Sequence, residues 1–129
     1  MSDSKKEPDI AADNDGTTIT STLVDPFEVG DCQMNAGATV TLHLDDPDSG
    51  SSTLTWDADV LTRQTHFGDK WHQSFDFKTN HGKIIVSAEV DGPDMNDENQ
   101  TKHAHAEKTL TVDPDLFAAI HKVDWTGEC

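Results

Sequence analysis

The sequence predicts an all-β protein: an antiparallel β-sandwich of immunoglobulin-like topology with six to eight strands and one short helix near the C-terminus. Three observations lead to this fold class. Apolar residues recur at every second position in several segments after residue 16, as in strands that bury one face. Polar turn residues separate those segments, and only one stretch has helical spacing. A small β-barrel is the alternative arrangement of the same strands.

The alternation is clearest in the middle of the chain. In 38–44, Val40, Leu42 and Leu44 share one face and Thr39 and Thr41 the other. The same pattern predicts strands at 17–24, 52–60, 71–77 and 83–90, with Trp56 and Trp71 pointing into the core. A sixth strand is expected at 107–112 and a short irregular one at 27–34. The segment Thr79-Asn-His-Gly82 predicts a hairpin loop between 71–77 and 83–90, because Asn and Gly tolerate positive φ.

The two ends of the chain differ from this pattern. Asp113 and Pro114 are good helix-starting residues, and apolar residues at helical spacing follow, so a short helix is expected within 113–123 with Trp125 closing the core. Residues 1–16 hold seven charges and few apolar side chains, and are predicted to be a flexible acidic tail. A single domain is then expected over 17–129, a length that can bury a core of its own.

The chain is strongly acidic, with 25 Asp and Glu against 9 Lys and Arg and a formal net charge of −16. The stretch 17–62 contains eight acids and no Lys or Arg. Such a field repels phosphates and attracts cations or basic protein surfaces, so direct nucleic-acid binding is disfavoured and a basic protein partner is favoured. Charge that serves only solubility is the alternative interpretation.

No segment approaches the roughly 20 apolar residues of a membrane-spanning helix, so no membrane span is expected. The N-terminal residues lack the apolar region of a secretory signal, which leaves a cytoplasmic protein or one whose signal has been removed.

Two cysteines, Cys32 and Cys129, are separated by 97 positions (129 minus 32). We expect a disulfide between them and, with it, an oxidising location in the periplasm, at the cell surface or in the secreted fraction. Two free thiols in a cytoplasmic protein are the alternative. The Cys and Trp spacing of immunoglobulin domains is not met, because Trp56 lies too far from Cys32.

Three sets of residues are candidate metal ligands. Two Asp-rich turns offer the hard oxygen ligands that calcium prefers. His103 and His105 would project to one face of an extended strand, where two imidazoles suit a transition metal, with a further His or an acid across the sheet as third ligand. The two turns supply Asp45, Asp46 and Asp48, and Asp91, Asp94 and Asp97. Solvated turns and a polar strand face are the structural alternatives, and no resident cofactor is expected beyond such an ion.

The chain has no phosphate-binding glycine loop, no serine nucleophile elbow and no HExxH pair, so we expect no enzyme. The leading hypothesis is a non-enzymatic extracytoplasmic binding or accessory module that contacts a protein through its acidic surface. A cytoplasmic acidic inhibitor that mimics nucleic acid on a basic partner is one alternative, and a calcium or transition-metal module is the other. The seven histidines also suggest a pH response, since their protonation would change the net charge from −16 to −9 (−16 plus 7).

Overall fold

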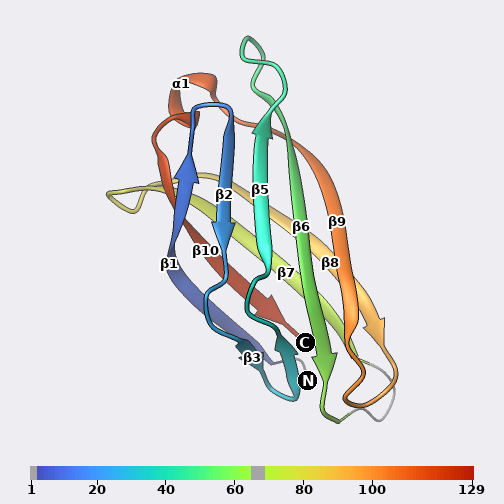
Figure 1. The fold of residues 1–129 in the computed structure, drawn as a ribbon. Coiled ribbons are helices and arrows are strands. Elements are labelled where there is room, and N and C mark those ends of the chain that lie inside the picture. The colour runs from blue at the N-terminus through green and yellow to red at the C-terminus, as the bar shows by residue number, and fades with distance from the viewer. Residues whose placement is uncertain (1–2, 65–68) are drawn as a thin grey trace.

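The computed structural model describes residues 3–64 and 69–129 and is almost entirely antiparallel β structure (Figure 1). Ten strands and one short helix follow one another along the chain. They are β1 (Ser4–Asn14), β2 (Thr18–Thr22), β3 (Phe27–Val29), β4 (Cys32–Met34), β5 (Thr39–Leu44), β6 (Ser51–Thr62), β7 (Asp69–Thr79), β8 (Ile84–Met95), β9 (Lys102–Thr111), α1 (Pro114–Phe117) and β10 (Ile120–Glu128).

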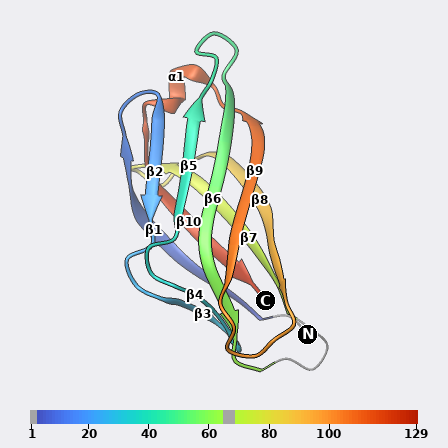
Figure 2. The same cartoon turned by 45° about the vertical axis from the view of Figure 1, so that its right-hand side comes forward.

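The strands form two layers that face each other across the core (Figures 1 and 2). One layer runs β9-β6-β5-β2, and β4 and β3 extend it below β5 because β4 pairs with the last residues of β6. The other layer runs β10-β7-β8. The predicted antiparallel sandwich is confirmed, with ten strands in place of the expected six to eight. The two layers remain connected along one side, because β1 pairs with β2 in one layer and with β10 in the other.

The prediction of a flexible tail at residues 1–16 is wrong for residues 4–14, which form β1. Its first part pairs with β10 from Ser4↔Glu128 to Ala11↔Lys122, and its last three residues pair with β2. Ile10 and Ala12 pack against the core, and the backbone satisfies edges of both layers that would otherwise be open. The charged side chains cost little because they keep access to solvent, with Lys5, Lys6 and Glu7 each 40% exposed or more.

The core is built from the alternating residues of both layers. The largest fully buried side chains include Trp56, Trp71 and Trp125, as expected from their phase with neighbouring apolar residues. Phe75 packs edge-on against Trp125 with ring centroids 5.0 Å apart, a favoured aromatic geometry. The alternation in 83–90 places Ile84 on the same face as the buried Ala88 and Val90, but Ile84 begins β8 and is 51% exposed.

The predicted C-terminal helix is present for only one turn. Asp113 caps α1 by accepting the N–H of Asp115, but the chain becomes strand β10 from Ile120 onward. The helix-like spacing of Ile120 and Val123 results from an irregularity in the pairing with β7, which shifts the alternation by one residue. A strand is favoured here because β1 and β7 pair with both of its edges.

Several loops follow the prediction and others do not. The 79–82 hairpin is confirmed, since Gly82 N–H donates to the Thr79 carbonyl and β7 pairs with β8. The irregular segment 27–34 is a hairpin of two short strands, β3 and β4, that turns at Gly30 with φ 57°. The Asp-rich segment from Asp91 is a turn only after Met95, because β8 continues to that residue, and β9 starts at Lys102 rather than Glu107.

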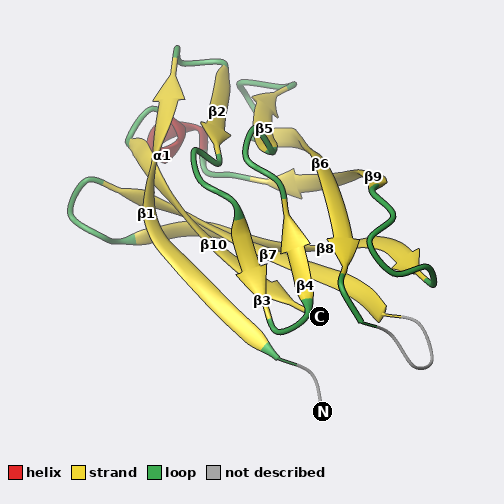
Figure 3. Ribbon diagram, turned by 60° about the horizontal axis from the view of Figure 1, so that its bottom comes forward, coloured by secondary structure: helices red, strands yellow, loops and turns green. Residues whose placement is uncertain are grey.

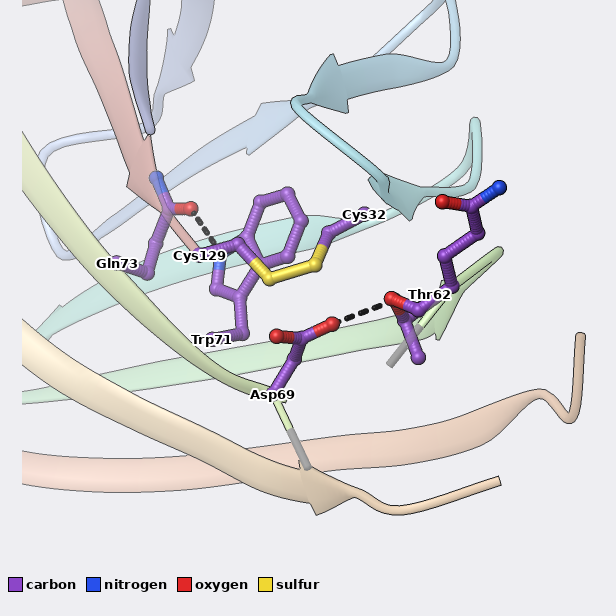
Figure 4. Close-up of a disulfide and its surroundings, with 7 residues drawn as sticks. Cys32, Thr62, Asp69, Trp71, Gln73 and Cys129 are labelled. Atoms are coloured by element: carbon purple, nitrogen blue, oxygen red, sulfur yellow. Dashed lines mark hydrogen bonds between the residues drawn. A yellow bond between two sulfur atoms is a disulfide. The ribbon is translucent and has the colours of Figure 1, made fainter. Parts of the chain in front are cut away.

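Cys32 in β4 and Cys129, the residue after β10, are joined as a disulfide with their Cα atoms 6.3 Å apart (Figure 4). The expected pairing is therefore present. Viewed from its lower end, the molecule has its C-terminus close to β3 and β4 (Figure 3). Asp3 and Cys129 also exchange two backbone hydrogen bonds, so the first strand and the last residue are held at the same place.

Candidate binding face

The solvent side of the β2-β5-β6-β9 layer is a continuous polar surface, here called the outer face. It consists of the outward-pointing residues of these four strands, whose alternate neighbours point toward the other layer. Nine are threonines, whose branched side chains suit strands: Thr18, Thr20, Thr22, Thr39, Thr41, Thr53, Thr55, Thr109 and Thr111. The remainder are Ser51, Leu61, three acids and three histidines.

The charged groups of the outer face are all acidic or histidine. Asp57 and Asp59 lie on β6 and Glu107 on β9. Among these outward positions, all within the described part of the chain, none is Lys or Arg. Lys108 of β9 has the opposite phase, and its ammonium donates to the Glu89 carbonyl of β8 at 3.1 Å. The outward positions of β2, β5 and β6, which belong to the base-free stretch, thus join those of β9 in a surface without outward Lys or Arg.

Two histidines of β9 meet two aspartates of β6 on this face. The strands pair antiparallel, so that His105 lies opposite Asp57 and His103 opposite Asp59, and such directly opposed side chains interact across the sheet. His105 Nδ1 is 2.6 Å from Asp57 Oδ1, and His103 Nδ1 is 3.1 Å from Asp59 Oδ1. His103 Nε2 is also 3.4 Å from Asp57 Oδ1, so one carboxylate oxygen contacts both imidazoles.

The neighbouring carboxylates favour the protonated form of His105. The hydrogen bond to Asp57, supported by its charge and by nearby Glu107, raises the pKa of His105 above its ordinary value. Glu107 Oε1 lies 3.6 Å from His105 Nε2. A shallow hollow of about 150 Å³ adjoins the cluster. It is lined by Ala36, Gly37, Ala38, Thr39, Asp57, Ala58, Asp59 and His103.

Three acidic segments lie at one end of the sandwich: α1, the β1–β2 turn and the β5–β6 loop (Figure 1). Leu44 N–H donates to the Thr17 carbonyl, and Val112 N–H donates to the Gly50 carbonyl, so these segments are connected. The end carries seven aspartates, namely Asp13, Asp15, Asp45, Asp46, Asp48, Asp113 and Asp115.

The first predicted calcium set lies at this end, and two of its carboxylates stabilise the turn itself. Asp46 accepts the backbone N–H of Asp48 and the hydroxyl of Ser49, bonds that lower the pKa of Asp46. Asp45 accepts the hydroxyl of Thr53 at 2.6 Å. Asp45 and Asp46 thus have hydrogen-bond partners within or beside the turn, and calcium binding by Asp45, Asp46 and Asp48 stays a prediction.

The second predicted calcium set is divided between a strand and a loop. Asp91 and Asp94 belong to β8, and Asp97 follows it. Asp91 pairs with His72 of β7 at 2.6 Å, a hydrogen bond that lowers the pKa of Asp91. The three side chains therefore do not share one loop, and calcium binding at either Asp-rich segment stays a prediction.

Within the described residues, one group of three metal-type ligand atoms lies mutually within 4.8 Å: those of Cys32, Asp69 and Cys129 (Figure 4). Thr62 orients Asp69 by donating its hydroxyl at 2.6 Å. Because both sulfurs are bonded to each other, they are not free as ligands. Sequence reasoning did not select Asp69, since only the closure of the chain ends brings it to the cysteines.

The fold and surface define a disulfide-closed antiparallel β-sandwich with one acidic, base-free face. Residues 49–129 match the model of a family of unknown function (DUF6294), and the chain belongs to this family. No curated protein matches the chain. Among the described residues, no helix has the length and apolar character needed to cross a membrane.

One similar solved structure is the crystal structure of the enzymatically active domain of bacteriophage CBA120 tailspike protein 4. It is 11% identical, with a TM-score of 0.29, over 98% of this chain and 17% of that chain. This chain thus spans about a sixth of that structure's length, and at this TM-score the likeness supports no conclusion about fold or activity.

Proposed function

We propose that this protein is a non-enzymatic binding module that acts outside the cytoplasm and binds a cationic protein surface on its outer face. The proposal rests on the arrangement of charged side chains on the outer face. Four adjacent strands present Asp57, Asp59 and Glu107 with no outward Lys or Arg, and this surface borders the end that carries seven aspartates. Complementary charge of this kind steers a basic partner and determines its orientation.

The location outside the cytoplasm is supported by the Cys32–Cys129 pair, because disulfides persist mainly in oxidising compartments. A thiol assay tests this part directly. Protein isolated from its native compartment without reductant should show no reactive thiol, and denaturation with reductant should then release two. Two reactive thiols before reduction would favour the cytoplasmic inhibitor instead.

Binding is tested with an oligo-arginine peptide as the probe, titrated calorimetrically at low and at high salt in the presence of a chelator. We expect binding that weakens as salt rises, because exposed charge pairs are screened. Replacing the three outer-face acids together (Asp57→Asn, Asp59→Asn, Glu107→Gln) should weaken it about tenfold, since three exposed pairs contribute roughly 0.5 kcal/mol each.

The matched control replaces three acids of the opposite layer (Asp76→Asn, Glu89→Gln, Asp91→Asn), which changes the net charge by the same amount. Its affinity for the peptide should remain that of the unmodified protein. Equal loss in both triple variants would mean that net charge alone attracts the peptide, and absence of binding at low salt would remove the proposal.

A further inference from the structure

The cluster on β6 and β9 has a donor set that the charge of the outer face alone does not explain. His103 and His105 are two positions apart on one strand, so their side chains leave the sheet on the same side. Asp57 lies directly opposite His105 and diagonally opposite His103. Figure 2 shows β6 and β9 side by side along the open edge of the layer.

We propose that His103, His105 and Asp57 bind one divalent transition-metal ion, with Cu²⁺ preferred over Zn²⁺. Two imidazole nitrogens and a carboxylate oxygen are a borderline N₂O donor set, which suits Cu²⁺, and Cu²⁺ also stands highest among divalent first-row ions in affinity for such sites. The ion would occupy the outer face, and it requires neither reduction of the disulfide nor a second protein.

Asp57 is the central residue of the proposed site because both imidazole rings already contact its carboxylate. Its Oδ1 atom lies 2.6 Å from His105 Nδ1 and 3.4 Å from His103 Nε2. Each ring reaches the same oxygen, but the three donor atoms are not grouped as tightly as those of the cysteine site. Coordination of one ion by all three side chains therefore requires rotation of the imidazoles. Their exposure permits it, since the side chain of His103 is 63% exposed and that of His105 is 52% exposed.

Two further carboxylates flank the site and can orient the rings. Asp59 Oδ1 is 3.1 Å from His103 Nδ1, and Glu107 Oε1 is 3.6 Å from His105 Nε2. An acid on the second ring nitrogen of a ligating histidine fixes the ring and raises its basicity. The base-free surroundings add a field that concentrates cations.

The His72–Asp91 pair of β7 and β8 provides a matched control. It is the same cross-strand pair at the same 2.6 Å distance, and it too is exposed, but among the described residues Asp91 contacts one imidazole, that of His72. If two imidazoles and a shared carboxylate make the site, the replacement of His72 must leave metal binding unchanged.

The test titrates Cu²⁺ alone, and separately Zn²⁺ alone, into the oxidised full chain by calorimetry. Electron paramagnetic resonance of the Cu²⁺ sample then counts the coordinated nitrogens. We expect one ion per chain, coupling to two imidazole nitrogens, and weaker Zn²⁺ binding. His103→Gln, His105→Gln and Asp57→Asn should each weaken Cu²⁺ binding at least tenfold, and His72→Gln should not.

Coupling to a single nitrogen, no binding, or an equal loss in His72→Gln and His105→Gln would overturn the proposal. The three histidines are exposed and the side chain of Asp57 is 42% exposed, and a thermal melt of each variant establishes that it is folded. The result is independent of the proposed function, because His105→Gln removes a ligand without removing an acidic charge from the outer face. Peptide binding in chelator should therefore survive in that variant.

Discussion

The carboxylate of Asp124 accepts the backbone N–H of Asp9 at 2.8 Å, within the irregularity that interrupts the β1–β10 pairing between Glu7 and Ile10. Asp9 has φ 57°, a left-handed conformation that is unfavourable for a residue other than glycine. Lys78 bonds both residues, with its ammonium 2.9 Å from Asp9 Oδ1 and 3.1 Å from Asp124 Oδ1. One buried carboxylate thus stabilises the irregularity of β1 within its pairing with β10.

Asp124→Asn should lower the free energy of unfolding by about 2–3 kcal/mol, because it leaves the half-buried Lys78 ammonium without its buried counter-charge. The amide oxygen of Asn can still accept from Asp9, so the fold should persist. Urea denaturation measures the change. Asp94→Asn, at an exposed position of β8, should stay within about 0.5 kcal/mol of the unmodified protein, and an equally small effect at Asp124 would show that the ion pair contributes little.

Stability should also decline in acid. Burial alone would raise the pKa of Asp124, but the Asp9 amide and the ammonium groups of Lys78 and Lys6 outweigh it and hold that pKa below its usual value. A carboxyl group with a lower pKa in the folded state stabilises the fold above its unfolded pKa of about 3.9, and this stabilisation is lost as pH falls through the folded pKa. When the pH is lowered from 5, the melting temperature should therefore begin to decrease at about pH 4. The decrease should be less steep in Asp124→Asn. Parallel curves for the two proteins would contradict this assignment.

The alternation of apolar residues predicted the strands that have one buried and one exposed face, such as β5 and β6. It did not predict β1, where only Ile10 and Ala12 contact the core and pairing to two other strands supplies the rest of the stabilisation. Residues 113–123 were predicted as a helix because the irregularity after Ile120 gives a strand the apolar spacing of a helix. The spacing of apolar residues indicates which side chains are buried, but it does not indicate which strands pair or where a bulge lies.

In the candidate site, too, the local sequence predicted some features, while others depend on how distant strands pair. The alternation in β9 placed His103 and His105 on one face, and this follows from the local sequence. Their partner Asp57 could not be identified, because it depends on the register between β6 and β9, which joins positions 48 residues apart for His105. Asp69 beside the disulfide depends in the same way on the meeting of three distant segments.

Residues 4–14 should resist proteolysis in the native protein, although their composition resembles that of a disordered segment. Their backbone N–H groups are protected by pairing with β10 and β2, and cleavage requires local opening. Limited proteolysis with a protease specific for Lys, followed by mass spectrometry, tests cleavage after Lys5 and Lys6. The exposed Lys83 in the β7–β8 hairpin is the internal control. Cleavage at Lys5 or Lys6 before Lys83 would support the flexible tail predicted from the sequence and contradict the pairing of β1.

Gly50→Ala should destabilise the protein by about 2 kcal/mol or more. Gly50 has φ +83°, and a Cβ atom there would overlap the carbonyl oxygen of Val112. The Gly50 carbonyl accepts the N–H of Val112, a bond that holds the two segments together. Gly37→Ala is the matched control, because Gly37 has φ +94° with no atom near its Cβ position, so it should cost only the backbone strain of about 1 kcal/mol. Equal destabilisation of the two variants in urea would show that the close approach of Val112 is unimportant.

The Cys32–Cys129 disulfide should contribute a large share of the stability, because it closes 97 residues of the unfolded chain. Chain-entropy estimates for a loop of that length approach about 5 kcal/mol, and losses of about 2–5 kcal/mol are usual for native disulfides. The double variant Cys32→Ser, Cys129→Ser should therefore melt at a clearly lower temperature, with hydrogen exchange first increasing at Asp3 and in the adjoining part of β1. Reductant should shift the unmodified protein to the same melting temperature and leave the double variant unchanged. An unmodified protein whose melting temperature does not respond to full reduction would show that strand pairing alone holds the chain ends in place.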